Sequence, residues 1–167
     1  NLDFLVNNSH LSGLHSLDLS MNRIGRIEAN TFGALRSLKK LNLNSNELKS
    51  LPAAGLFVAS LEELELNSNR IEHIHPDAFA GMTAFAALWL KSNALKSLDP
   101  RVFAPLAKSL ALLDLSKNVE LELDSVARAL AGLELPSAST FAMPGGRLSS
   151  VLSSGRLAAY VPLMAVS

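Results

Sequence analysis

Several features are absent from this chain of 167 residues. It has no cysteine, which excludes disulfide bonds, thiolate metal sites and cysteine nucleophiles and leaves the redox compartment open. Its 15 basic residues balance its 15 acidic residues, so the formal net charge is zero. A neutral chain has no broad field to attract nucleic acid or an anionic membrane. We therefore expect a partner to be recognised by local contacts.

Long hydrophobic runs are also missing. The longest spans residues 157–166, is ten residues long and contains Pro162, whereas a membrane-spanning helix needs roughly 18 or more apolar residues. We therefore expect no membrane insertion in this sequence. The chain begins at Asn1 with no initiator methionine and no apolar leader, as a piece of a longer protein would.

Leucine, by contrast, supplies 34 of the 167 residues, roughly twice its ordinary share. The leucines recur every 23 to 25 residues, in five consecutive copies of L-x-x-L-x-L-x-x-N. These copies, repeats 1 to 5, begin at Leu14, Leu38, Leu61, Phe85 and Leu110. The two central leucines of each copy alternate with outward positions, which predicts a short strand with one buried face. Because one copy cannot bury its leucines alone, the copies are expected to stack into a parallel sheet.

The phase and period of Leu14–Asn118 resemble the leucine-rich repeat family. In repeats 1, 3 and 4 the asparagine opens N-x-I/L-x-x-I/L-x-x-x-x-F, similar to the 24-residue subtype of animal extracellular proteins. Toll-type receptors, Slit-like guidance proteins and insect adhesion and immune proteins carry that subtype. The resemblance implies an α/β leucine-rich repeat solenoid, with short parallel strands on the concave face and turns and short helices on the convex face.

The resemblance also implies a function: a non-enzymatic module for protein–protein recognition, in a secreted or cell-surface adhesion or innate immune receptor. Extracellular members usually carry cysteine-rich end caps, and their absence favours an alternative, a cytoplasmic leucine-rich repeat scaffold. A targeting domain cut from a larger enzyme is a third possibility.

The two ends depart from the repeat. Residues 1–13 are interpreted as an eroded repeat or a partial N-terminal cap, and residues 14–123 as the five repeats. Residues 124–135 are predicted to hold a short helix, capped by Asp124 or Ser125, and a weak sixth strand over residues 130–135 with Ala138 in the asparagine position. Residues 136–167 contain no acidic residue, which indicates a divergent cap, a disordered tail or a gene-model artefact.

The repeated asparagine lies where each strand turns away, and a carboxamide offers both donors and an acceptor to turn backbone. We interpret the series as an internal hydrogen-bonding ladder rather than a ligand site. Its members are Asn22, Asn46, Asn69, Asn93 and Asn118. By the same phase, Phe32, Phe79 and Phe103 are expected to form a core spine on the convex side.

No residue pattern indicates catalysis. His73, His75 and Asp77 could suggest a metal, but no third ligand is in phase with the histidines, so we expect neither a metal nor a cofactor. No G-x-S-x-G motif is present, and the Gly145-Gly146 pair is too sparse for a phosphate loop.

Candidate binding residues come from the strand face opposite the leucines. An exposed tryptophan is the residue type most enriched in binding hot spots, so the single Trp89 is the centre of this prediction; the alternatives are that the C-terminal segment covers it or that it has no role. The predicted concave-face set is Trp89, Lys91, Ala87, Leu112, Glu63, Glu65 and Asp114. Glu62 joins Glu63 and Glu65 in an expected acidic zone.

Two further expectations concern the surroundings of the chain. Asn7-Asn8-Ser9 is the only N-x-S/T sequon, so an extracellular protein could carry a glycan on Asn7. Uncapped end repeats would expose leucines, which predicts aggregation or a homodimer of the isolated piece.

Overall fold

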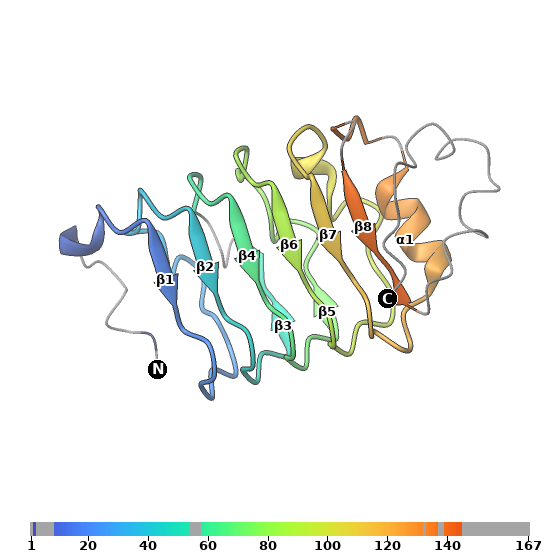
Figure 1. The fold of residues 1–167 in the computed structure, drawn as a ribbon, viewed down its shortest axis with the longest axis horizontal. Helices are drawn as coiled ribbons and strands as arrows, with labels where there is room; N and C mark the ends of the chain where they lie inside the picture. Colours follow the sequence, from blue (N-terminus) through green and yellow to red (C-terminus); the bar gives the residue numbers. More distant parts are fainter. Residues whose placement is uncertain (1, 3–8, 54–57, 132, 137–138, 145–167) are drawn as a thin grey trace.

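The protein is described by a computed structural model that covers residues 2, 9–53, 58–131, 133–136 and 139–144. Six short parallel strands form one sheet, with each strand contributed by a successive turn of the chain (Figure 1). In spatial order they are β1 (Ser16–Asp18), β2 (Lys40–Asn42), β4 (Glu63–Glu65), β6 (Ala87–Trp89), β7 (Leu112–Asp114) and β8 (Thr140–Ala142). This arrangement confirms the predicted leucine-rich repeat solenoid.

The register of the sheet follows the repeat. The middle residue of each strand pairs with the middle residue of the next, from Leu17 with Leu41 through to Leu113 with Phe141. Because side chains alternate along a strand, this register places the central leucines of every turn on the same inner face.

The other side of the solenoid consists mainly of turns. Two-residue strands β3 (Ser50–Leu51) and β5 (His73–Ile74) form a second parallel sheet, and the 3-10 helices η2 (Ser9–Leu11) and η3 (Ala104–Leu106) add single turns. The α-helix α1 (Leu123–Leu130) lies at the C-terminal end of the main sheet (Figure 1).

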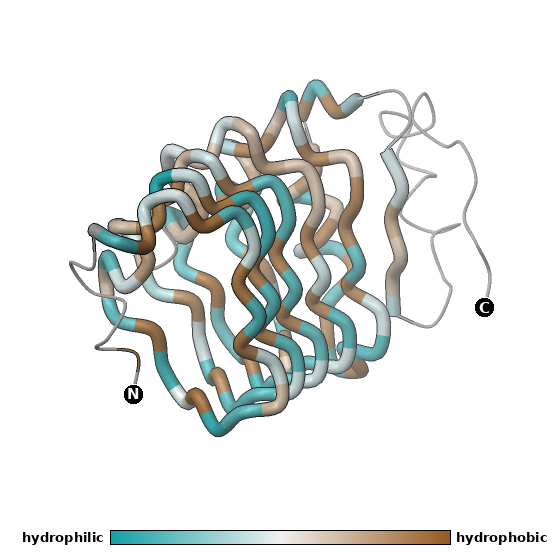
Figure 2. The backbone as a smooth tube through the Cα atoms, turned by 60° about the vertical axis from the view of Figure 1, so that its left-hand side comes forward, coloured by the Kyte–Doolittle hydropathy of each residue, from teal (hydrophilic) through white to brown (hydrophobic). Residues whose placement is uncertain are grey.

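The core is a continuous apolar column between the sheet and the turns. Figure 2 shows that hydrophobic and hydrophilic residues alternate along the turns, and the hydrophobic ones supply this column. Phe32, Phe79 and Phe103 are fully buried, and the Phe79 ring stacks on Phe103 with a centroid distance of 6.2 Å. Phe79 also stacks on Phe85 at 5.8 Å. The phenylalanines are therefore core residues, as the repeat phase predicted.

A left-handed residue follows the strand region in every repeat. Its φ lies between 54° and 58° at Met21, Ser45, Ser68, Ser92 and Lys117. Such a φ is uncommon outside glycine, asparagine and aspartate, so these residue types gave no sequence signal. The conformation redirects the chain directly before each repeated asparagine.

The N-terminal repeat is the least covered. Leu14, Leu17, Leu19 and Ile24 are only half-buried, whereas their counterparts in repeat 2 are at most 1% exposed. Asn7 and Asn8 lie outside the described residues.

Two predictions about the C-terminal end were wrong. The helix α1 has Glu122 as its N-cap, with no side-chain cap bond, instead of Asp124 or Ser125. The Ser125 hydroxyl donates to the Glu122 carbonyl at 2.7 Å and accepts the Leu98 N–H at 3.1 Å. Ser125 therefore ties the helix to repeat 4 instead of capping it.

The sixth strand is β8, not residues 130–135. Leu130 and Leu135 are 5% and 6% exposed, but Leu130 ends the helix α1 and Leu135 lies in irregular backbone. Their burial comes from packing on the last turns, which gives the same apolar signal as a strand. Ala138 and residues 145–167, in the predicted divergent or disordered tail, lie outside the described residues.

Candidate functional site

Four of the repeated asparagines are buried and bridge adjacent turns. The Nδ2 of Asn69 donates to the Leu66 carbonyl of its own repeat at 3.1 Å and to the Leu43 carbonyl of repeat 2 at 2.9 Å. Its Oδ1 accepts the Leu48 N–H of repeat 2 at 3.1 Å. Asn46, Asn93 and Asn118 make equivalent bonds. These amides are occupied by the backbone of the preceding turn and are not free for a ligand.

Asn22 differs from the predicted ladder. It is exposed, and its Nδ2 donates only to the Leu19 and Ser20 carbonyls of its own turn, each at 3.0 Å. Among the described residues, no N–H donates to its Oδ1. Asn22 therefore makes no bridge to a described neighbouring turn.

A second set of polar side chains on the concave face also binds backbone. We define the central column as the residue between the two strand leucines and the second column as the residue two positions later. The central column is Asp18, Asn42, Glu65, Trp89 and Asp114, and the second column is Ser20, Asn44, Asn67, Lys91 and Ser116. Each N–H of the second column receives a side-chain acceptor, but the acceptor comes from two different places.

In repeats 1, 2 and 5 the acceptor is the central residue of the same turn. Oδ1 of Asp18, Asn42 and Asp114 accepts the N–H two residues later at 2.8, 3.0 and 2.9 Å. Two hydrogen bonds lower the pKa of Asp18: the larger effect comes from the Ser20 side chain and the smaller from the Ser20 N–H. The carboxyl of Asp114, predicted as a binding group, therefore has a structural use.

In repeats 3 and 4 the acceptor comes from the preceding turn. Asn44 Oδ1 accepts the Asn67 N–H at 2.7 Å, and Asn67 Oδ1 accepts the Lys91 N–H at 2.9 Å. The central residues of these two turns, Glu65 and Trp89, are thereby released from binding their own backbone. This difference could have been found in the sequence. The two turns whose central residue is neither Asp nor Asn are each preceded by a turn with an asparagine in the second column.

The predicted acidic zone is mostly paired with lysines of repeat 2. Lys39 Nζ lies 2.8 Å from Glu62 Oε1, and Lys40 Nζ lies 2.9 Å from Glu63 Oε1. The hydrogen bond to Glu63 raises the pKa of Lys40. Glu65 accepts a hydrogen bond from Asn44 Nδ2. These contacts neutralise most of the zone, so it does not present three free carboxylates.

Trp89 lies in the C-terminal half of the concave face, between Glu65 of β4 and Asp114 of β7 in the strand register. Its side chain is half-buried rather than fully exposed, Leu112 is half-buried, and Ala87 is 9% exposed. Lys91 is exposed. The structure thus brings the predicted apolar residues together on neighbouring strands around the Trp89 position.

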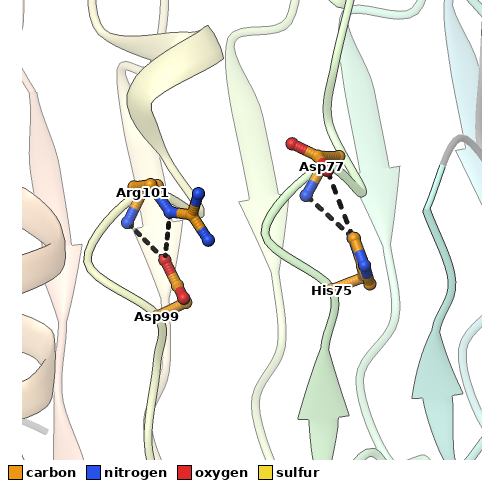
Figure 3. Close-up of polar contacts among 4 residues, drawn as sticks. All are labelled: His75, Asp77, Asp99 and Arg101. Carbon is orange, nitrogen blue, oxygen red and sulfur yellow. Dashed lines mark hydrogen bonds and ion pairs between the residues drawn. The ribbon is translucent and has the colours of Figure 1, made fainter.

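His75, one of the two histidines considered as metal ligands, stabilises a turn after β5 (Figure 3). His75 Nδ1 accepts the Asp77 N–H at 3.1 Å, and in repeat 4 Asp99 Oδ1 accepts the Arg101 N–H at 2.8 Å in the same position. The hydrogen bond from the Arg101 N–H lowers the pKa of Asp99 most. The Arg101 guanidinium, whose Nε lies 3.2 Å from Asp99 Oδ1, lowers it further. Within the described ranges no group of three or more metal-binding residue types gathers.

In the part of the chain that the structure describes, no helix is both long and apolar enough to cross a bilayer.

Comparisons with known proteins agree with this geometry. The Leucine rich repeat family model matches residues 10–57 and 59–119. No curated protein matches the chain. Among solved structures, a leucine-rich repeat protein of Leptospira interrogans superimposes with a TM-score of 0.64 at 26% identity, over 81% of this chain and 32% of that protein. The present chain thus spans about a third of that bacterial protein's length.

Leucine-rich repeat domains are generic protein–protein interaction modules and typically not enzymes. Because the family model covers more than half of the residues and the strands follow its repeats, the chain belongs to the leucine-rich repeat family.

Proposed function

We propose that this chain is a non-enzymatic recognition module that binds a protein ligand or receptor through the C-terminal half of its concave face, around Trp89. The observation that carries the proposal is the release of Trp89 from the backbone. Asn67 of the preceding turn binds the Lys91 N–H that a central aspartate or asparagine would otherwise bind. The scaffold therefore does not need a particular side chain at position 89, and a half-exposed indole there serves a contact.

The N-terminal half of the concave face is a poorer candidate. Lys40 is paired with Glu63, and Asn44 with Glu65, so a partner that used these groups would first have to break existing bonds. Exchanging one set of polar contacts for another yields little net free energy. Trp89 and Leu112 instead offer apolar area that is still partly in water.

We further propose a secreted or cell-surface receptor as the setting. The N-x-I/L-x-x-I/L-x-x-x-x-F endings and the Asn7 sequon support it. A cytoplasmic scaffold is the second candidate, because the sequence has no cysteine-rich segment of the kind that extracellular members usually carry. Secretion from an animal cell followed by mass spectrometry of Asn7 tests the first setting: a glycan is expected there, and its uniform absence would weaken the extracellular proposal.

The binding proposal is tested with a phage-displayed library of natural protein domains, selected on the immobilised chain. Trp89→Ala should weaken the selected domains by about 2 kcal/mol or more, roughly thirtyfold. Lys108→Ala is the matched control, because Lys108 is exposed at the opposite end of the strands. Domains that bind wild type and Trp89→Ala equally well would refute the proposed surface.

Stability must be measured on the same variants. Because Trp89 is half-buried, its replacement should lower the free energy of unfolding by less than the roughly 3–5 kcal/mol of a core aromatic. A loss of that full size would show that the indole is a core group, and the binding result would then reflect misfolding.

A further inference from the structure

Two carboxylates flank Trp89 on the neighbouring strands. In the strand register Trp89 pairs with Glu65 of β4 on one side and with Asp114 of β7 on the other (Figure 1). Adjacent strands lie about 4.8 Å apart, and paired residues point to the same face of the sheet. The half-buried indole is therefore bordered on both sides by an acidic side chain.

Each of these carboxylates has one oxygen in use. Glu65 Oε2 accepts a hydrogen bond from the Asn44 side chain, and Asp114 Oδ1 accepts the Ser116 N–H at 2.9 Å. Within the part of the chain that the structure describes, Glu65 Oε1 and Asp114 Oδ2 receive no hydrogen bond, and neither carboxylate is in an ion pair. A ligand can therefore bind the second oxygen of each group without breaking a bond of the scaffold.

The cations of this face are attached further from the indole than the two carboxylates are. Lys40 Nζ is held 2.9 Å from Glu63 Oε1; the hydrogen bond to Glu63 raises the pKa of Lys40 most, and the charge of Glu65 raises it least. Lys91 and Lys117 are exposed and lie beyond the C-terminal ends of β6 and β7. Because Lys91 is two residues past the tryptophan, its Cα lies about 6.6 Å along the strand. The charges directly beside the ring are therefore negative.

The indole itself adds a second preference for positive charge. The face of an aromatic ring carries the negative part of its quadrupole, so a cation over the ring is attracted, and tryptophan is the strongest of the aromatic side chains in this contact. The end of the strands opposite Lys91 is apolar, because Ala87 and the half-buried Leu112 lie two residues before Trp89 and Asp114. Arginine fits both features, since its planar guanidinium stacks on aromatic rings and donates in the ring plane to carboxylates.

We propose that the partner inserts an arginine side chain between Glu65 and Asp114, with its guanidinium stacked on the Trp89 indole. The guanidinium N–H groups donate to the two carboxylate oxygens described above, and the aliphatic stem packs on Leu112. A carboxylate in this place would meet two like charges and the negative face of the ring, and a neutral apolar side chain would bury both carboxylates without a partner. The inference rests on the proposed function, since it names the chemistry of the partner for the same face.

Amide variants remove the two charges and keep the bonds of the scaffold. Asp114→Asn retains the Oδ1 that accepts a backbone N–H, and Glu65→Gln retains an acceptor for the Asn44 side chain. Asp18→Asn is the matched control, because Asp18 makes the same backbone bond on β1 but pairs with an asparagine instead of a tryptophan. All of these variants should melt close to the wild type, so a change in binding reports the charge.

The test uses a phage-displayed library of random peptides, selected on the full chain, with affinities of synthetic peptides measured by calorimetry. We expect enrichment of arginine, and a change in the fluorescence of Trp89, the only tryptophan, on binding. Glu65→Gln/Asp114→Asn should weaken the selected peptides by about tenfold. Replacing the arginine of the peptide by citrulline, which keeps the planar shape without the charge, should weaken them similarly. Asp18→Asn should leave binding unchanged, and Lys91→Gln should tighten it by about twofold or more because a competing cation is removed.

The results separate this inference from the proposed function. If Trp89→Ala abolishes binding while the double amide variant and the citrulline peptide bind at full strength, the concave-face proposal stands and the arginine inference fails. If Trp89→Ala also binds at full strength, both fail. A library that yields acidic peptides, peptides without arginine or no binder at all overturns the inference, as does weaker binding to Lys91→Gln.

Discussion

Replacing Asn69 by alanine is the sharpest test of the bridging asparagines. The change leaves the Leu48 N–H without its acceptor, and Leu48 is fully buried. The three carbonyls to which Asn69 donates keep one partner each. Asn46 also donates to Leu43, Asn93 to Leu66, and the Ser45 N–H to Asn67. The expected loss is that of one buried unpaired donor, about 1–3 kcal/mol.

Asn22→Ala is the matched control within the same series. Asn22 is exposed, and water can replace its two bonds to Leu19 and Ser20. The Leu19 carbonyl also keeps the bond from Asn46 Nδ2 at 2.9 Å. We therefore expect Asn22→Ala to change the free energy of unfolding by less than about 0.5 kcal/mol.

Calorimetry and urea unfolding measure the difference, and roughly 2–4 °C of melting temperature per kcal/mol is expected for a chain of this size. Hydrogen exchange then shows which repeats lose stability. Because Asn69 bonds repeat 2 directly and reaches repeat 4 only through the carbonyl it shares with Asn93, amides of repeats 2 and 3 should lose most protection. Equal melting of Asn69→Ala and Asn22→Ala would refute the structural role and reopen a ligand role for these amides.

The remaining predictions concern the concave face, acid stability and association. Asp114→Ala should destabilise the chain by about 1 kcal/mol because the Ser116 N–H loses its acceptor, whereas Glu65→Ala should leave the melting temperature nearly unchanged; the opposite order would contradict the exchange of acceptors between turns. Asp99 has a pKa lowered by Arg101, so its stabilisation is complete above the unfolded value of about 3.9 and disappears as the pH falls through the lower folded value. Asp99→Asn should therefore flatten the acid limb of a melting-against-pH curve, and an unchanged limb would count against the contact. The half-buried Leu14, Leu17 and Leu19 predict self-association, which sedimentation velocity would disprove by showing a monomer at every concentration.

The repeat part of the fold could be predicted because burial and spacing carry the same information there. A leucine at the centre of each strand must face inward if the turns are to stack, so the period alone aligned Leu17, Leu41 and Leu64 correctly. The C-terminal end lacks this redundancy. Thr140–Ala142 forms a strand through backbone pairing with β7, but it lacks the leucines that mark the other strands.

The candidate site was predicted less well, because exposure depends on contacts that position does not reveal. Phase placed Trp89 and Glu63 on the outer face, but it could not show that Lys40 occupies Glu63 or that Trp89 is half-buried. The exchange of acceptors between turns was legible in the sequence, since Asn44 and Asn67 stand before the two turns that need them. The exposure of Val119 was not, because the one-residue slip from Asn118 to Leu121 does not by itself show which side chain stays in water.

The acceptors supplied by Asn44 and Asn67 divide the central column into constrained and unconstrained sites. At Asp18, Asn42 and Asp114 the side chain completes the backbone of its own turn, so drift away from a short polar residue is penalised. At positions 65 and 89 the preceding asparagine has already met that need, and selection can explore any residue that fits the surface. Randomising these two positions should leave the melting temperature of most library members near that of the wild type, whereas randomising 42 and 114 should lower the free energy of unfolding by about 1 kcal/mol per site. A protein that adds an asparagine to its second column thereby gains one freely evolving contact on the next turn.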